Sequence, residues 1–258
     1  MTFIQAVIYS IVEGVSEFLP ISSTGHLILA SDILRISQSE FIKSFEIIIQ
    51  LGAILAVVVL YFNALTKNLK LWKSIIIAFI PTGILGLTLY RVIKQYLLGS
   101  TSITLWSLLI GGVALIILEL RYKEQKHHLD SVEKVSPWQA VGIGLFQSIA
   151  MIPGVSRSAA SIFGGMFLGL KRQTAVEFSF MLAIPTMLAA SGLDLFQSRQ
   201  VIAQSGNLAL LATGFAGSFI VALLTIKFFL NYIQKNNFIP FGIYRIIAAI
   251  IFWLVAIR

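Results

Sequence analysis

Hydrophobic residues run along the chain in long stretches that carry no regular polar alternation. Six of these stretches reach the roughly 17–25 residues that a helix needs to cross a bilayer. They lie at 46–62, 75–90, 101–120, 174–196, 207–230 and 239–257. The run ILAVVVLYF at 54–62 lacks the alternation of β-barrel strands. The pattern therefore predicts an all-α polytopic membrane protein with six transmembrane helices.

Two further apolar stretches, 3–34 and 138–169, are interrupted near their middles by proline, glycine and hydroxyl side chains. Each half is too short to span a bilayer. Pro20 lacks an amide hydrogen and disfavours helix at the residue before it, so a helix starting near Thr2 should end around Phe18. The hydroxyls of ISST at 21–24 are good caps for a second helix, and IPGVSRSAAS at 152–161 repeats the arrangement. We expect two re-entrant helical hairpins.

The two interrupted stretches resemble each other at a fixed spacing. The tripeptide QAV at 5–7 returns at 139–141, an offset of 134 residues, and three apolar spans follow each broken pair. Three crossings is an odd number, so the second copy must insert upside down. We predict a single integral membrane domain over 1–258, divided into repeat one at 1–120, a polar linker at 121–137 and repeat two at 138–258. This arrangement is an inverted-topology repeat.

Composition supports a membrane location, because 57% of the 258 residues are hydrophobic and only 12% are charged. The net charge of +8 would suggest nucleic-acid binding in a soluble protein. Here the basic residues lie mostly in short loops, so we expect no nucleic-acid partner. Lys and Arg are enriched in the loops at 63–74, 121–136, 171–172 and 227–237. The positive-inside rule makes these loops cytoplasmic and places both termini on the other side.

Charged residues inside lipid are costly, which makes the segment EGVSEFLPISSTGH at 13–26 a candidate site. Glu13 and Glu17 are four residues apart, so a helix presents both carboxylates on one face. Hard divalent cations take oxygen ligands and accept phosphate oxygens in the same shell. We therefore predict that Glu13 and Glu17 hold Mg²⁺ or Ca²⁺.

The helix starts after the two breaks suit an anion, because their first amides lack intrahelical partners and the dipole end is positive. Arg157 adds a planar fork that matches phosphate oxygens. The predicted substrate-binding residues are Ser22, Thr24, Ser156, Arg157 and Ser158.

Ser23 and His26 lie on one face of the second helix, where an imidazole could activate a hydroxyl. The predicted chemistry is phosphoryl transfer, with Glu17, Ser23, His26 and Arg157 as catalytic residues. Ser23, His26 and a metal-bound water all stay open as the nucleophile. Cysteine is absent from the chain, which excludes a thiolate nucleophile.

EGVSEFLPISSTGH at 13–26 and PGVSRSAAS at 153–161 closely resemble the two signature regions of the undecaprenyl-diphosphate phosphatase family, bacterial enzymes associated with bacitracin resistance. The resemblance implies a multi-pass enzyme of the bacterial cell (inner) membrane. Such an enzyme removes the terminal phosphate of a polyprenyl diphosphate lipid and so recycles the lipid carrier for peptidoglycan synthesis. It also implies a site that opens to the extracytoplasmic side and the same roles for Glu13, Glu17, Ser23, His26 and Arg157. Ser161 stands where the family commonly has threonine.

Two other functions fit parts of the sequence. Phosphatidic-acid-type phosphatases need a second histidine after the arginine, and Phe163 occupies the place where one would look for it, so we reject this class. A transporter or lipid flippase remains the alternative, because inverted repeats with broken helices are typical of transporters. The sequence is also compatible with a homodimer and leaves the oligomeric state open.

Overall fold

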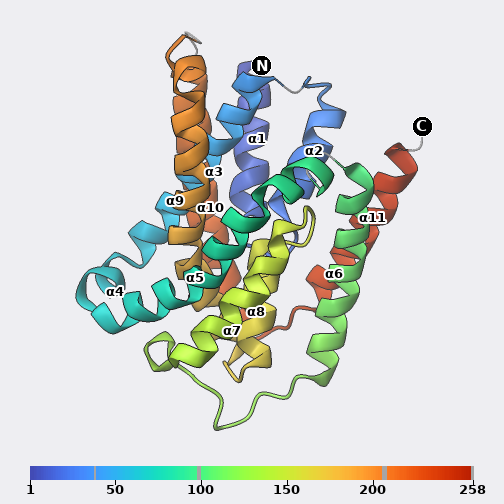
Figure 1. The fold of residues 1–258 in the computed structure, drawn as a ribbon. Helices are drawn as coiled ribbons and strands as arrows, with labels where there is room; N and C mark the ends of the chain where they lie inside the picture. Colours follow the sequence, from blue (N-terminus) through green and yellow to red (C-terminus); the bar gives the residue numbers. More distant parts are fainter. Residues whose placement is uncertain (38, 98–99, 205–207, 257–258) are drawn as a thin grey trace.

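The computed structural model describes residues 1–37, 39–97, 100–204 and 208–256, and almost all of them are helical (Figure 1). In chain order the α-helices are α1 (Phe3–Ser16), α2 (Ser23–Ile33), α3 (Glu40–Leu60), α4 (Phe62–Lys67), α5 (Leu69–Val92), α6 (Thr101–Arg121), α7 (Pro137–Ser148), α8 (Arg157–Phe167), α9 (Arg172–Gln204), α10 (Leu208–Ile233) and α11 (Ile239–Ala256). Three short helical turns are η1 (Ile93–Leu97), η2 (Val132–Lys134) and η3 (Ile149–Met151). Within the described ranges, β structure is limited to one parallel bridge between Leu129 and Leu170. The all-α prediction is confirmed.

In the described part of the chain, five helices are long and apolar enough to cross a membrane. They cover 40–60, 69–89, 101–121, 172–192 and 208–233. The sixth expected crossing, 239–257, corresponds to α11, whose apolar part Ile239–Leu254 is shorter than these five. Residue 257 lies outside the described residues. A multi-pass membrane protein is therefore confirmed, while the sixth crossing stays a prediction.

The outer faces of these helices are apolar, as contact with lipid requires. Ile84 and Leu87 on α5, Ile110 on α6 and Leu224 on α10 are each more than half exposed. In water such a surface would be a large unfavourable patch, whereas lipid tails solvate it without cost. The polar side chains of the breaks described below point inward instead.

The α1–α2 and α7–α8 pairs have matching local structure. In each pair the two helices pack against each other, with α1–α2 in the upper part of Figure 1 and α7–α8 in the lower part. Thr2 and Gln5 form a capping box at the start of α1, and Ser136 and Gln139 form one at the start of α7. These positions share the offset of 134 residues found in the sequence. Reciprocal caps satisfy backbone donors that lipid could not.

The equivalence extends to the far ends of the pairs. Gln5 donates its side-chain amide to the carbonyl of Leu34 at 3.3 Å, and Gln139 does the same to Leu168 at 2.9 Å. The residues after these carbonyls, Arg35 and Gly169, both have a positive φ, 51° and 88°. Each pair is therefore closed by a contact between the start of its first helix and the end of its second.

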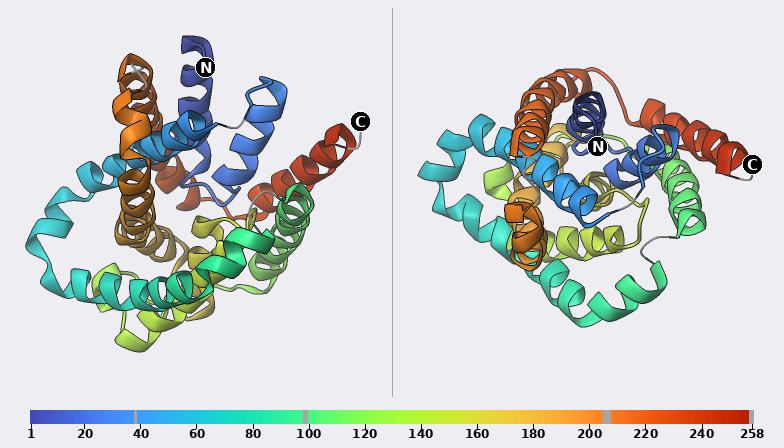
Figure 2. Two further views of the ribbon diagram at one scale, coloured as in Figure 1. Left: turned by 45° about the horizontal axis from the view of Figure 1, so that its top comes forward. Right: turned by 90° about the horizontal axis from the view of Figure 1, so that it is seen from above.

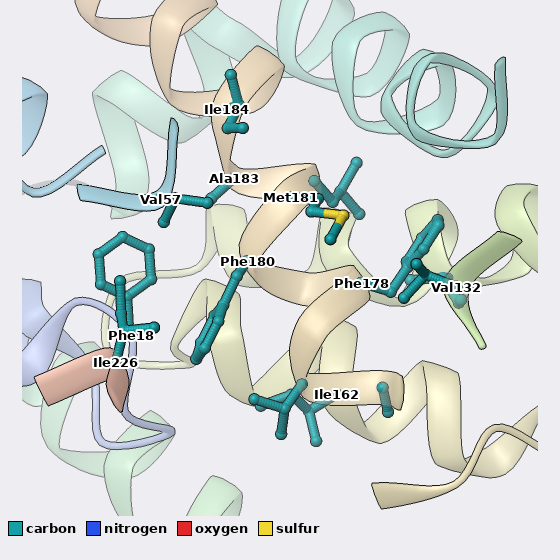
Figure 3. Close-up of a cluster of buried hydrophobic side chains, with 14 of the residues drawn as sticks. Phe18, Val57, Val132, Ile162, Phe178, Phe180, Met181, Ala183, Ile184 and Ile226 are labelled. Carbon is teal, nitrogen blue, oxygen red and sulfur yellow. The ribbon is translucent and has the colours of Figure 1, made fainter. Parts of the chain in front are cut away.

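The main apolar core surrounds α9 and includes Phe18 of the first helix break. Figure 3 shows Phe178, Phe180 and Met181 of α9 among side chains from other elements, and Phe18, just after α1, packs beside Phe180. The Phe18 and Phe180 rings meet edge to face at 5.3 Å, and both are fully buried. Aromatic pairs of this geometry add to the energy of burial itself. The core thus fixes the segment that directly follows Glu17.

Helices α6 and α11 form a pair at one side of the molecule, apart from the α3, α9 and α10 group (Figure 2). Gly112 and Gly242 allow this close approach, because a Cβ on Gly112 would lie 2.7 Å from the carbonyl oxygen of Gly242. Small residues at such crossings let membrane helices pack backbone to backbone.

Glu119 at the end of α6 forms a buried ion pair with Arg172 at the start of α9. The Arg172 Nε donates to Glu119 Oε1 at 2.7 Å, and the backbone amide of Phe238 donates to Oε2 at 3.2 Å. Glu119 is only 6% exposed. Removing one partner of such a pair leaves an uncompensated buried charge.

We expect Glu119→Ala to lower the free energy of unfolding by about 3 kcal/mol, because it leaves the buried Phe238 amide without its acceptor and Arg172 with only the longer 3.6 Å contact to Glu124. Thermal unfolding of the purified protein in detergent measures the change. Glu133→Ala is the matched control, since Glu133 lies exposed in η2 and should have little effect. Equal stability of the two variants would contradict this account of the pair.

Candidate active site

The two helix breaks come together around a cavity of about 240 Å³. Its walls include Glu17, Ser22, Ser23 and Thr24 of the first break and Gly154, Ser156 and Arg157 of the second, with Gln50 of α3 and Thr186 of α9. A larger polar cavity of about 740 Å³ lies near the start of α9 and the α10–α11 connection, and none of the predicted site residues lines it. Most of the predicted site residues therefore gather around the smaller cavity.

Glu17 joins the two breaks directly. Its Oε1 accepts a hydrogen bond from an Arg157 Nη at 2.9 Å, and its Oε2 accepts one from the Ser23 hydroxyl at 2.6 Å. Glu17 is 6% exposed, so both contacts lie in a poorly solvated place. Glu17 thus links the first helix break to the arginine of the second.

Arg157 is held from several directions. It donates to the backbone oxygen of Ser179 at 2.9 Å, and its guanidinium lies 5.7 Å from the centre of the Phe18 ring. Its Nε is buried and has no hydrogen-bond partner among the described groups. A phosphate oxygen would satisfy this remaining donor.

The serines that cap the second helix of each pair are strained in the same way. Ser22 and Ser156 both have a φ of 75°, which is uncommon for a residue with a Cβ. Their side chains accept from the amides of Gly25 and Ala159, at 3.4 and 3.2 Å. Strain of this kind persists only where the surroundings enforce it, and it concentrates at functional sites.

Of the other hydroxyl residues in the two breaks, one lines the cavity and two hold neighbouring helices together. Thr24 lines the cavity. Ser158 is fully buried and donates to the carbonyl of Phe18 at 2.8 Å, so it fastens α8 to the first helix break. Ser161 donates to Arg157 O at 2.9 Å and lies 2.6 Å from the Ser179 hydroxyl.

Glu13 lies one turn before Glu17, 1% exposed, and neither of its carboxylate oxygens has a hydrogen-bond partner among the described groups. A buried, unpartnered carboxylate is costly unless it is protonated or meets a cation. Its two oxygens suit a hard cation, and the Glu17 carboxylate is one turn away. In the described residues no group of three or more acidic, histidine or cysteine side chains could hold a metal. Water and phosphate oxygens would have to complete the shell.

His26 is fixed by contacts different from those expected. Its Nδ1 lies 2.7 Å from the Ser22 carbonyl oxygen and therefore donates to it, and its Nε2 accepts from the Tyr244 hydroxyl at 2.6 Å. The two rings stack at 5.5 Å with 7° between their planes. His26 does not line the 240 Å³ cavity in the described arrangement, and the Ser23 hydroxyl bonds to Glu17 instead.

Sequence reasoning missed several contributors to the site. Tyr244 and Arg245 come from α11, more than 200 positions from the first break, and Ser179 comes from α9. The usable signal for Arg245 was its position as a charged residue inside an apolar stretch. Ser179 gave no such signal in the sequence, because hydroxyls are common in membrane helices and usually bond to backbone carbonyls.

Comparison with known proteins adds independent support. The family model of bacitracin resistance protein BacA matches residues 6–251. A protein of Persephonella marina named undecaprenyl-diphosphatase is 52% identical over 254 residues, covering 98% of this chain and 99% of the relative. Proteins of the same name from Aquifex aeolicus and Wolinella succinogenes are 52% and 48% identical, over 98% of this chain and 98% and 97% of theirs. Both helix breaks lie inside the matched region, and the chain therefore belongs to the BacA family of bacitracin resistance proteins.

Proposed function

We propose that the protein is an undecaprenyl-diphosphate phosphatase, which converts undecaprenyl diphosphate and water to undecaprenyl phosphate and inorganic phosphate. One observation carries the proposal. Glu17 binds Arg157 of the other break and the Ser23 hydroxyl in one buried cavity, in a chain whose relatives bear this name. The reaction would regenerate the lipid carrier of peptidoglycan synthesis, and bacitracin resistance follows from it.

Arg157 and the helix-start amides of α2 and α8 would bind the terminal phosphate. The buried Nε of Arg157 has no hydrogen-bond partner among the described groups, and the starts of both helices line the cavity. These donors would stabilise the charge that spreads over the phosphoryl oxygens in the transition state.

Ser23 is the nucleophile that the contacts favour, and Glu17 is its proton acceptor, because the 2.6 Å hydrogen bond already points from hydroxyl to carboxylate. The Ser23 oxygen forms a bond to the terminal phosphorus, the bridging P–O bond breaks, and undecaprenyl phosphate leaves with the bridging oxygen. Water then attacks the phosphoserine, which releases inorganic phosphate and frees Ser23. His26, held by Tyr244 and the Ser22 carbonyl, would position the start of α2.

A divalent cation, Mg²⁺ or Ca²⁺, would be held by Glu13 and by the remaining lone pairs of Glu17. Support comes from the two partnerless oxygens of Glu13, which lie one turn from Glu17. When bound, the ion would neutralise diphosphate charge next to these carboxylates.

The membrane location suits a substrate with a long hydrocarbon tail. Moving each CH₂ of that tail from lipid to water costs about 0.8 kcal/mol, so extraction of a C55 chain would be prohibitive. A polar cavity formed by broken helices reaches the head group while the tail stays in lipid. The lipid substrate and the bilayer are accordingly the partners we propose.

The proposed architecture is an inverted repeat of 1–120 and 138–258 around the linker 121–137, with two re-entrant hairpins and six crossings. The matching capping boxes and the equal φ angles of Ser22 and Ser156, both at an offset of 134, support it. We propose that the termini and the cavity opening lie on the extracytoplasmic side of the bacterial inner membrane, and the loop charges support this side for the termini. The homodimer also stays a prediction, which a mass measurement in detergent tests.

We expect the purified protein in detergent to release inorganic phosphate from undecaprenyl diphosphate and to lose this activity with a chelator. Added Mg²⁺ or Ca²⁺ should restore it, since either ion can take oxygen ligands from Glu13, Glu17 and the diphosphate. A protein that only transports or flips lipid would release no phosphate in detergent, and that result would contradict the proposed function. Full activity in the presence of the chelator would contradict the proposed cation and leave the proposed phosphatase function standing.

A further inference from the structure

Arg245 of α11 is a fully buried cation that the proposed reaction does not use. Its exposed fraction is 0%, and no carboxylate forms an ion pair with it among the described residues. A buried charge without a counter-ion is expensive and needs dense hydrogen bonding to persist. The hydrogen-bond acceptors of Arg245 therefore indicate its role.

All of its hydrogen bonds go to backbone carbonyls near the cavity. The acceptors are Leu108 O at 3.3 Å and Ser107 O at 3.0 Å in α6, Pro20 O at 3.2 Å in the first break, and Gly154 O and Val155 O, both at 2.9 Å, in the second break. One guanidinium thus satisfies five carbonyl oxygens and uses its full set of donors. It connects three segments that are distant in the sequence.

The carbonyls in the breaks occupy equivalent places. Pro20 lies two residues before Ser22, and Gly154 lies two residues before Ser156, at the offset of 134 that relates the two pairs. Ser22 and Ser156 are the strained caps from which α2 and α8 begin. The guanidinium therefore holds both breaks immediately before the residues that shape the cavity.

The neighbouring helix leaves space for this side chain. A Cβ on Gly111 of α6 would lie 2.2 Å from an Arg245 Nη, a separation that no side chain could tolerate. Gly154 has a φ of 89°, and a Cβ there would lie 2.4 Å from the carbonyl oxygen of Thr104 in α6. Glycines in α6 and in the second break thus admit the guanidinium and the close contact around it.

We propose that Arg245 is a positioning residue, which clamps the two helix breaks at the separation where Glu17, Ser23 and Arg157 meet. The effect on catalysis rests on the proposed function, whereas the clamp itself is a statement about structure. Small displacements of reacting groups are costly, about 10²-fold in rate for 1 Å.

The activity test compares Arg245→Met and Arg245→Lys with the parent protein. We expect Arg245→Met to lower kcat for phosphate release by about 10- to 100-fold while KM changes less than threefold, because the reacting groups are displaced and the lipid still binds. Arg245→Lys should restore part of kcat, since an ammonium can replace up to three of the five donors. Glu119→Ala is the control: it should lower stability and leave kcat of the folded protein unchanged.

A second measurement does not depend on the substrate. The chain has no cysteine, so Ile33→Cys and Phe167→Cys, 65% and 67% exposed at the ends of α2 and α8, allow two spin labels to be placed without background. In the Arg245 parent we expect one narrow distance distribution by pulsed electron paramagnetic resonance. In Arg245→Met it should shift or broaden, with Arg245→Lys in between.

Gly111→Ala keeps the arginine and intrudes on its guanidinium, so it provides the same test if Arg245→Met does not fold. It should broaden the distance distribution in the same direction. An unchanged distribution together with unchanged kcat in either variant would overturn the positioning role. If the parent releases no phosphate, the proposed function fails, while the distance measurement still decides whether the clamp exists.

Discussion

Ser23→Ala is expected to reduce phosphate release from undecaprenyl diphosphate by at least about 10⁴-fold, because it removes the proposed attacking oxygen. The Ser23 hydroxyl is the group that already donates to Glu17, at 2.6 Å, beside the Arg157 guanidinium. Alanine occupies less volume and leaves the 240 Å³ cavity intact, so binding should change little. The main effect should therefore fall on kcat.

Single-turnover kinetics in detergent with saturating lipid measure this loss directly. Ser23→Thr retains a hydroxyl and should keep measurable turnover, and Thr24→Ala removes the neighbouring hydroxyl in the same cavity wall with less than a tenfold effect. A Ser23→Ala protein that retains more than a tenth of the parent rate would refute attack by Ser23. In that case water or His26 would have to be the nucleophile.

Arg157→Lys should lower kcat/KM by about 10³-fold, the range in which an arginine that stabilises a transferring phosphoryl group acts. The planar guanidinium contacts Glu17 and the Ser179 carbonyl at once, both at 2.9 Å, and retains a free Nε for phosphate. A lysine ammonium keeps the charge and loses this fork.

Steady-state kinetics of Arg157→Lys and Arg157→Gln distinguish the contribution of the positive charge from that of the planar guanidinium. The neutral glutamine should be at least as damaging as lysine, because Glu17 would then lack its partner. Arg121→Lys, at the exposed end of α6, is the matched control and should behave like the parent. Near-normal kcat/KM in Arg157→Lys would show that the guanidinium geometry is dispensable.

The sequence allowed the positions of the breaks to be predicted because their causes are local. Pro20 cannot continue a helix, and the hydroxyls that follow cap the next one, which begins at Ser23 as expected. Pro81 and Pro185, by contrast, lie inside the continuous helices α5 and α9. Neighbouring helices can re-satisfy the carbonyl that a proline frees in a membrane, which sequence patterns do not reveal.

The partners of individual side chains could not be predicted in this way. The spacing of Ser23 and His26 puts them near each other on α2, yet Ser23 turns to Glu17 and His26 to Tyr244. Which of these contacts forms depends on where α11 lies, and that follows from its packing on α6 through Gly112 and Gly242. Tertiary packing of distant segments decides such choices, and single-sequence periodicity carries no information about it.

The pairing of Glu17 with Arg157 also bears on how the catalytic cycle ends. At the Arg157 Nη, a phosphate competes with an internal carboxylate that is already 2.9 Å away, so its net gain there is only the difference between two ion pairs. A diphosphate with a lipid tail gains additional contacts from its second phosphate and from the bilayer. Inorganic phosphate has neither, so in the proposed reaction Glu17 would compete with it for Arg157 and favour release of this small product.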